Sequence, residues 1–258
     1  MLRKETNGIA WHEFEGLEGS GVIHAFLTRL GGASAPPFDT LNLGHTVGDD
    51  LAAVEENHER AFAELGIRRE QVVSPYQVHG AHVRLVSQAH TGTTQPATDG
   101  LLTTTPGVAL LLRFADCVPI LLFDAKQRAV GIIHSGWKGA AGNIAAAAVT
   151  AFARHAGSRP GDLWAGIGPA IGPCCYEVGE EMADTISQIS PEGIGVLRRR
   201  EGGLYLDLPG LVRAQLAEAG VQQITLSDVC TACHTGEWFS HRAENGRTGR
   251  FGALAMLA

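Results

Sequence analysis

The sequence has 258 residues, 45% of them hydrophobic and 18% charged, a composition typical of a chain with a sizeable core rather than a disordered one. Its net charge of −7 argues against nucleic-acid binding, because phosphate backbones require clustered lysines and arginines. The start of the chain lacks the apolar stretch of a signal peptide, charged residues interrupt every long apolar run, and the five cysteines do not form a secreted disulfide pattern. We therefore expect a cytoplasmic protein that binds neither nucleic acid nor membranes.

Apolar runs bounded by turn residues predict strands at 21–28, 72–73, 82–86, 108–113, 119–123, 129–134, 163–167 and 224–226. Helical spacing and capping residues predict helices from Asp49 or Asp50 to Gly66, with Leu51, Val54, Phe62 and Leu65 on one face, and at 143–155, 177–189 and 208–219. The basic run 198–200 is expected in a solvated loop. Because strands and helices are intermixed without strict alternation, repeats or a linker, the pattern indicates one α/β domain with mixed sheets over residues 1–258.

Three residues in the middle of the chain have the chemistry of metal ligands. His79 stands before Gly80, Cys117 lies in a break between two apolar runs, and His134 ends the next run. Two imidazoles and one thiolate suit zinc, and a fourth position left open is the mark of a catalytic rather than a structural zinc site. The same residues also fit a thiol dyad of Cys117 with His134 as its base. Both interpretations stay open at this level.

Charged residues near these ligands are candidates for further roles. Asp116 precedes Cys117 and either orients a metal-bound histidine or caps a turn. Lys138 and the amides around it precede a predicted helix, where they could hold an anion. Arg29, Arg242 and Arg250 lie among turn residues and suit recognition of phosphate or carboxylate, with a surface salt bridge as the alternative for each.

The remaining cysteines are predicted to have no metal. Cys230 and Cys233 form a CxxC segment, but no second CxxC is present to complete a structural zinc site. We expect this segment to pack or to lie near a nucleotide, and to be dispensable for metal binding and catalysis. No chemistry is assigned to the vicinal pair Cys174–Cys175.

Taken together, ordered segments along the chain resemble the laccase-domain family, also called YfiH-like or multicopper polyphenol oxidase laccase proteins. The segments that carry the resemblance are Thr28–Ser34, Leu41–His45, Val47–Asp50, Gln77–Gly80, Ala115–Pro119, His134–Gly139, Gly168–Gly172, Cys175–Val178, Cys230–Thr231, Phe239–Arg242 and Thr248–Arg250. They follow one another in order from about residue 23 to residue 250.

The resemblance implies a four-layer α-β-β-α sandwich with mixed sheets, related to the catalytic domain of cytotoxic necrotizing factor. It also implies a zinc ion held by His79, Cys117 and His134. Members of the family are associated with phosphorolysis of purine nucleosides, namely adenosine, inosine, guanosine and methylthioadenosine, and with adenosine deamination. One bacterial branch is linked to peptidoglycan editing.

The older oxidase name implies a copper cluster, which the ligand count of this chain does not support. Such clusters need several His-x-His pairs, and the sequence has none. The three methionines, Met1, Met182 and Met256, lie far along the chain from any cysteine–histidine run.

The leading hypothesis is a zinc-dependent purine nucleoside phosphorylase with adenosine deaminase activity and about one zinc per chain. Zinc lowers the pKa of a bound water, and the resulting hydroxide attacks C6 of adenine. Asp116 is the candidate general acid, and Arg29, Lys138, Arg242 or Arg250 would neutralise phosphate. The alternatives are a thiol hydrolase or amidase acting on peptidoglycan precursors through Cys117 and His134, and a non-catalytic metal-binding protein. The preferred nucleoside and the oligomeric state are not determined by these patterns.

Overall fold

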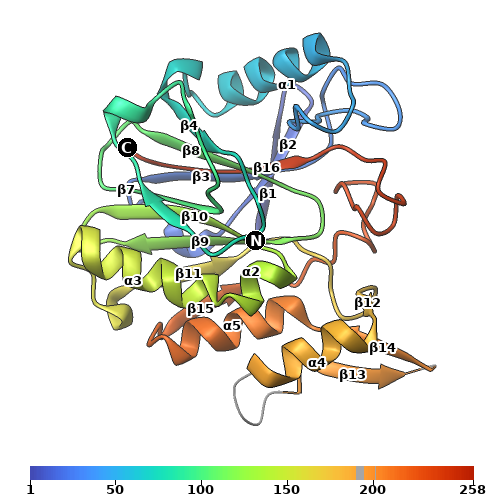
Figure 1. Cartoon of the computed structure of the whole chain (residues 1–258). Helices are drawn as coiled ribbons and strands as arrows, with labels where there is room; N and C mark the ends of the chain where they lie inside the picture. Colours follow the sequence, from blue (N-terminus) through green and yellow to red (C-terminus); the bar gives the residue numbers. More distant parts are fainter. Residues whose placement is uncertain (190–194, 201) are drawn as a thin grey trace.

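Two β-sheets lie face to face, and helices cover their outer faces (Figure 1). The structure is a computed structural model that describes residues 1–189, 195–200 and 202–258. Among these residues, the first sheet has the strand order β1 (Leu2–Thr6), β2 (Ile9–Glu13), β3 (Val22–Leu27), β16 (Phe251–Leu257), β8 (Ala109–Phe114), β4 (Val72–Pro75) and β6 (Thr94–Gln95). The second has the order β15 (Gln223–Leu226), β11 (Trp164–Ile167), β9 (Val118–Asp124), β10 (Ala129–Ser135), β7 (Gly100–Thr103) and β5 (Val83–Leu85). Both sheets combine parallel and antiparallel pairs, so they are mixed as predicted.

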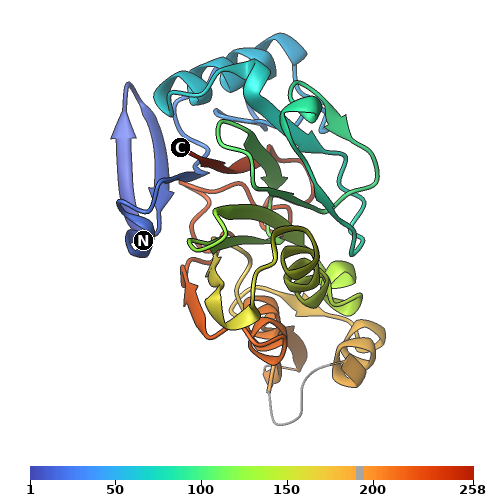
Figure 2. The same ribbon diagram turned by 90° about the vertical axis from the view of Figure 1, so that its left-hand side faces the viewer.

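The helices complete four layers. They are α1 (Leu51–Glu64), α2 (Trp137–Ala141), α3 (Ile144–Ala156), α4 (Glu180–Ile189) and α5 (Leu208–Glu218). Helix α1 covers the outer face of the first sheet, while α3 and α5 cover the second sheet on the opposite side of the molecule (Figures 1 and 2). The α-β-β-α arrangement expected from the resemblance is therefore confirmed.

Strand β9 shows why the central apolar runs are continuous rather than alternating. Side chains in a strand point alternately to opposite faces of its sheet. Leu121 and Phe123 pack into the core between the sheets, whereas Ile120 and Leu122 pack against the layer of α3 and α5. Both faces of this strand are buried, so nearly every position must be apolar.

The ends of the helices follow the predicted capping chemistry. Asp50 caps α1 by accepting a hydrogen bond from the amide of Ala52, and Asn143 caps α3. Leu51 departs from the predicted buried face of α1, because its side chain is 58% exposed in the first turn.

Within the described residues, no helix has both the length and the apolar character needed to cross a bilayer.

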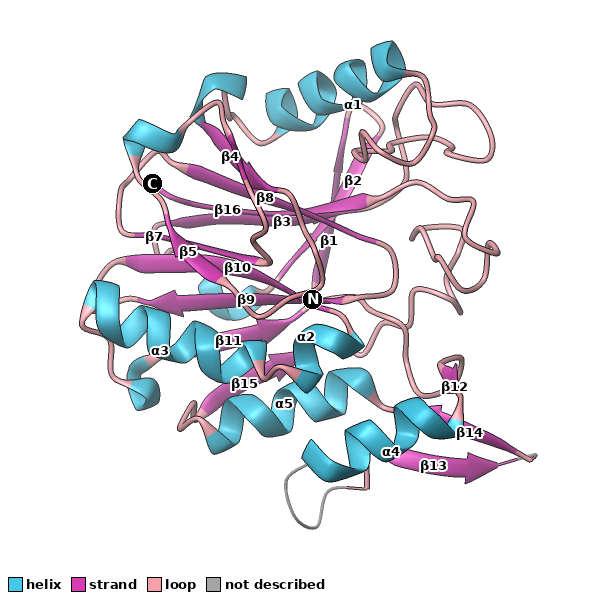
Figure 3. Ribbon diagram, in the orientation of Figure 1, coloured by secondary structure: helices cyan, strands magenta, loops and turns pink. Residues whose placement is uncertain are grey.

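Two predictions about local structure are wrong in the segment after residue 176. The predicted helix from Glu177 begins only at Glu180, because Glu177–Val178 forms β12 and pairs with β14 (Gly203–Leu206). The basic run 198–200 is exposed as expected, but it lies in β13 (Leu197–Arg200) rather than in a loop. These strands form a small third sheet beside α4 (Figure 3).

Candidate functional site

The three predicted metal ligands meet where the chain crosses between the two sheets. His79 lies in the connection from β4 of the first sheet to β5 of the second. Cys117 lies in the connection from β8 to β9, which makes the same crossing, and His134 lies near the end of β10. Their ligand atoms all lie within 4.8 Å of one another, with His79 exposed, Cys117 half-buried and His134 buried. The structure thus brings together residues that are 55 positions apart in the sequence.

A buried aspartate that the sequence analysis did not single out positions two of these ligands. Oδ1 of Asp99 lies 2.9 Å from Nδ1 of His134, and the carboxylate accepts hydrogen bonds from the backbone amides of Val78, His79 and Gly80. A carboxylate accepts, so Nδ1 of His134 carries a proton, and Nε2 is the ring nitrogen that faces the other two predicted ligands as a possible metal donor. Asp99 therefore fixes both the imidazole of His134 and the loop that presents His79.

Asp116 has a different role from the predicted orientation of a histidine. Its backbone is left-handed, with φ of +83°, and its carboxylate accepts hydrogen bonds of 2.7 Å from the hydroxyl of Thr231 and the amide of Arg242. The alternative in which Asp116 orients a metal-bound histidine is wrong for His134, because Asp99 occupies that place. Asp116 instead joins the turn before Cys117 to two later loops.

Cys117 and His134 stabilise opposite charges on each other, a negative charge on the thiol and a positive charge on the imidazole. Burial favours the neutral thiol, but the two histidines outweigh it and lower the pKa of Cys117 to about 6. Burial likewise favours the neutral imidazole, but Cys117 and Asp99 raise the pKa of His134 to about 9. A thiolate beside an imidazolium is thus the favoured state at neutral pH in the absence of a metal.

Gly136 is a point of close approach to the site. A Cβ at this position would lie 3.0 Å from Cδ2 of His79 and 3.1 Å from Sγ of Cys117. Gly136→Ala should therefore displace both ligands and lower the affinity of this site for zinc about 10- to 100-fold, as changes behind a ligand commonly do. Competition with a zinc chelator measures the effect. The matched control is Gly236→Ala, since nothing lies within 4 Å of a Cβ there; equal affinities for both variants would contradict the geometry.

The ligands line a cavity of about 900 Å³ whose walls are basic and aromatic. Arg113, Arg242 and Arg250 line it, together with Trp137 and Tyr176. Of these arginines, Arg242 and Arg250 are predicted site residues, and Arg113 was not singled out. A basic, aromatic cavity over a nitrogen–sulfur donor set suits a ligand that carries both an anionic group and a flat ring.

Arg113 and Arg250 both lie beside the segment Leu43–His45. Nε of Arg113 donates to the carbonyl of Leu43, and its Nη2 lies 3.5 Å from Nδ1 of His45, which also lines the cavity. Burial lowers the pKa of Arg113 to about 10, so it stays charged at neutral pH. The side chain of Arg250 packs against Gly44, which lies between Leu43 and His45. A Cβ added at Gly44 would lie 2.8 Å from Cγ of Arg250.

Arg242 lies next to Tyr176. Its guanidinium carbon lies 5.1 Å from the centre of the Tyr176 ring, and Nη1 donates to the carbonyl of Glu177. Burial raises the pKa of Tyr176 to about 12, which keeps the phenol neutral. The cavity wall therefore carries a cation beside Tyr176 as well as those beside Leu43–His45.

Two predicted anion-binding residues are not among those that line the cavity. Arg29 is 8% exposed, its guanidinium pairs with Asp39 and Glu244, and it stacks on Phe239. Lys138 is exposed on α2, so it lies within a short helix rather than in a loop before one. Of the four predicted anion-binding residues, Arg242 and Arg250 are thus the two that line the cavity.

The expectation that Cys230 and Cys233 lack partner cysteines is wrong. The pair Cys174–Cys175 lies beside them, and the four sulfur atoms are all within 4.8 Å of one another. These residues do not line the large cavity. They form a second cluster.

A profile described as "Multi-copper polyphenol oxidoreductase laccase" matches residues 23–258. The chain belongs to this family. Purine nucleoside phosphorylase YlmD of Geobacillus stearothermophilus is 40% identical over 242 residues, which cover 90% of this chain and 88% of that protein. A purine nucleoside phosphorylase of Deinococcus radiodurans is 39% identical, covering 92% and 89% of the two chains.

Solved structures of the family have the same fold. The hypothetical protein YfiH of Bacillus licheniformis superimposes with a TM-score of 0.93 at 35% identity, covering 99% of both chains. YlmD of Geobacillus stearothermophilus also gives a TM-score of 0.93, at 37% identity and with 98% and 97% of the chains covered. The relatives from Geobacillus stearothermophilus and Deinococcus radiodurans given above are both named as purine nucleoside phosphorylases.

Proposed function

We propose that this chain is a zinc-dependent purine nucleoside phosphorylase that also deaminates adenosine. The observation that carries the proposal is the convergence of His79, Cys117 and His134 on a cavity lined by arginines and aromatic rings. The names of the relatives support the phosphorylase part. Adenosine, inosine, guanosine and methylthioadenosine are the proposed substrates, with inorganic phosphate as the second one.

The donor set fits zinc. His79, Cys117 and His134 supply two imidazole nitrogens and one thiolate within a span that a single ion can bridge, and the cavity lies on their open side. The missing side chain of Gly136 leaves room beside two of them. Zinc held there supplies Lewis acidity toward a water molecule or a substrate oxygen in the cavity.

The chain's own residues would bind and orient the two substrates. Trp137 and Tyr176 offer aromatic faces for a purine, and the neighbouring arginines offer paired N–H groups for phosphate. Holding the phosphate against the sugar makes the attack effectively intramolecular. The walls of the cavity thus contribute mainly by position and charge.

The two reactions differ in their need for phosphate. In phosphorolysis, a phosphate oxygen bonds to C1′ of the ribose, the C1′–N9 bond breaks, and the purine takes the electron pair and a proton. The products are the free base and ribose 1-phosphate. In deamination, a water oxygen bonds to C6 of adenosine, the C6–N6 bond breaks, and the amino group takes the electron pair and a proton from the water to leave as ammonia. The charge of the arginines serves only the first reaction.

A nucleoside panel tests the proposal directly. Zinc-loaded protein should convert inosine and phosphate into hypoxanthine and ribose 1-phosphate, and should convert adenosine into inosine without phosphate. Metal-stripped protein should do neither until zinc is restored, and copper should not substitute. No turnover of any nucleoside by protein with full zinc occupancy would refute the proposal.

A second candidate function, a thiol hydrolase, is favoured by one observation. Asp99, His134 and Cys117 are arranged as orienting acid, base and nucleophile, with Asp99 on Nδ1 of the imidazole. Zinc and this chemistry compete for one sulfur, because a coordinated thiolate is a poor free nucleophile. Hydrolysis of an amide by metal-stripped protein, together with no turnover of any nucleoside, would favour this candidate.

The reactivity of Cys117 without metal should follow pH. Because the pKa of its thiol is lowered to about 6, alkylation of metal-stripped protein by iodoacetamide should rise as pH increases through about 6 and level off above it. Peptide mapping at a series of pH values locates the midpoint. His134→Ala should move the midpoint up toward the ordinary thiol value of about 8.5. A parent protein with a midpoint already near that value would contradict the charge-separated pair.

A further inference from the structure

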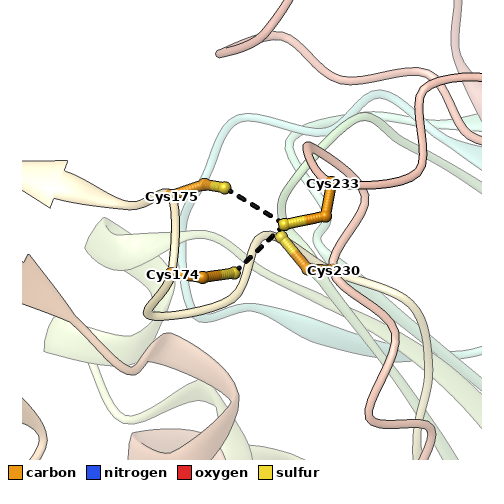
Figure 4. Close-up of side chains that lie close together, drawn as sticks. All are labelled: Cys174, Cys175, Cys230 and Cys233. Carbon is orange, nitrogen blue, oxygen red and sulfur yellow. Dashed lines mark hydrogen bonds between the residues drawn. The ribbon is translucent and has the colours of Figure 1, made fainter.

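Four of the five cysteines form a cluster that the proposed function does not use. Figure 4 shows Cys174 and Cys175 on one loop facing Cys230 and Cys233 on another. Sγ of Cys233 lies 3.4 Å from Sγ of both Cys174 and Cys175, and all four sulfur atoms lie within 4.8 Å of one another. Cys230 is buried, Cys175 is half-buried, and Cys174 and Cys233 are exposed.

The sheet brings the two loops together. Strands β11 and β15 pair in parallel, with Ile167 opposite Leu226 at their ends, so the segments that follow them leave the same edge. The amide of Ala170 then donates to the carbonyl of Val229, and Ala170 forms an isolated parallel bridge with Cys230. The backbone by itself therefore places the two pairs of cysteines opposite each other, without help from a metal.

The spacing of the sulfur atoms matches a tetrahedral site better than a disulfide. A disulfide bond is about 2.0 Å long, and all five cysteines are free. Zinc–sulfur bonds of about 2.3 Å imply sulfur–sulfur edges of about 3.8 Å in a tetrahedron. The observed separations of 3.4 Å are close to that edge. We propose that Cys174, Cys175, Cys230 and Cys233 bind a second zinc ion in a closed, structural site.

The surroundings of the cluster suit a negatively charged tetrathiolate. The amide of Gly172 donates a hydrogen bond of 3.2 Å to Sγ of Cys230, as backbone amides do for metal-bound thiolates. The guanidinium of Arg200 donates to the carbonyl of Pro173, next to Cys174, and brings a positive charge close by. A Cβ at Gly172 would lie 3.2 Å from Sγ of Cys174 and 3.3 Å from Cβ of Cys230, so the backbone passes close to two of the four cysteines here.

This second zinc ion would brace the catalytic turn. Thr231 follows Cys230 directly, and its hydroxyl holds the carboxylate of Asp116, which precedes Cys117. The amide of Ile171, from the loop that carries Cys174, donates to the carbonyl of Asp116. Both loops of the cluster therefore contact the residue that presents Cys117, and zinc would fix them relative to each other.

Metal content distinguishes the two sites. Purified under reducing conditions, the full chain should hold about two zinc ions, in place of the single ion expected from the sequence. The variant Cys174→Ser/Cys233→Ser, which changes two exposed residues, should hold one ion, as should Cys117→Ala. Combining all three substitutions should leave none. A parent protein with one zinc ion, and an unchanged content in the double variant, would overturn the proposal even if every nucleoside is turned over.

Thiol counting tests the same site without disturbing its ligands. In Cys117→Ala, only the four cluster cysteines remain, so zinc-loaded protein should react slowly with a thiol reagent and chelator-treated protein should react at four positions. Unfolding temperature should fall when the chelator removes the metal. Four reactive thiols in the zinc-loaded protein, or a mass that shows a disulfide in place of bound zinc, would overturn the proposal.

Discussion

Replacing His79, Cys117 or His134 with alanine should remove one zinc ion per chain and abolish phosphorolysis and deamination together. Three protein ligands are already the minimum for a tight catalytic site, so two cannot hold the ion. The ion proposed at Cys174, Cys175, Cys230 and Cys233 should remain. Metal analysis and turnover of inosine and adenosine measure the two effects on the same sample.

Two further variants make this expectation specific. His155→Ala removes an exposed histidine on the outer face of α3 and should change neither metal content nor turnover. Asp99→Asn keeps all three ligands but removes the acceptor behind His134, so zinc affinity should fall about 10- to 100-fold. Full zinc occupancy in Cys117→Ala would show that the site has been assigned to the wrong residues.

Alanine at Arg113, Arg242 or Arg250 should slow phosphorolysis and spare deamination. Loss of a cation that pairs with a buried phosphate costs about 2–4 kcal/mol, which corresponds to a loss in kcat/KM of tens- to several-hundred-fold. Deamination needs no phosphate, so adenosine turnover should stay within a few-fold of the parent. Rates at varied phosphate concentration, with both reactions followed on each variant, measure the difference.

The control for this series is Arg154→Ala, an exposed arginine in α3 that does not line the cavity. It should leave both reactions unchanged. An equal loss of phosphorolysis and deamination in all three cavity variants would mean that these arginines position the purine or support the fold. Such a result would show that Arg113, Arg242 and Arg250 do not bind the phosphate.

Most of the fold was predictable from local pattern. The runs 119–123 and 129–134 are apolar at nearly every position, which is typical of strands buried on both faces, and β9 and β10 form there. The N-terminal hairpin was not predicted, because β1 is exposed throughout and lacks an apolar pattern (Figure 2). Strand β16 was also missed, although it lies between β3 and β8 in the first sheet, because its partners are far from it in the sequence.

The residues of the candidate site were also predictable only in part. The side-chain chemistry of His79, Cys117 and His134 marked them as possible ligands from the sequence alone. Asp99 had no such mark, because its importance comes from the antiparallel pairing of β7 with β10, which sets Gly100 opposite Ile133. Arg113 stands at the end of the predicted strand 108–113, and nothing in the local pattern gives it a role in the site. It became a candidate when β8 placed it on the wall of the cavity.

The four-cysteine cluster shows most clearly what only the tertiary structure decides. Cys174–Cys175 and Cys230–Cys233 are separated by more than 50 residues, and neither spacing by itself completes a metal site. Their meeting depends on the parallel pairing of β11 with β15. The sequence by itself determined the residue types, the apolar periodicity and the membership of a family, because these are local or cumulative properties. The tertiary structure decided which loops share an edge, because strand pairing depends on long-range packing that no local pattern encodes.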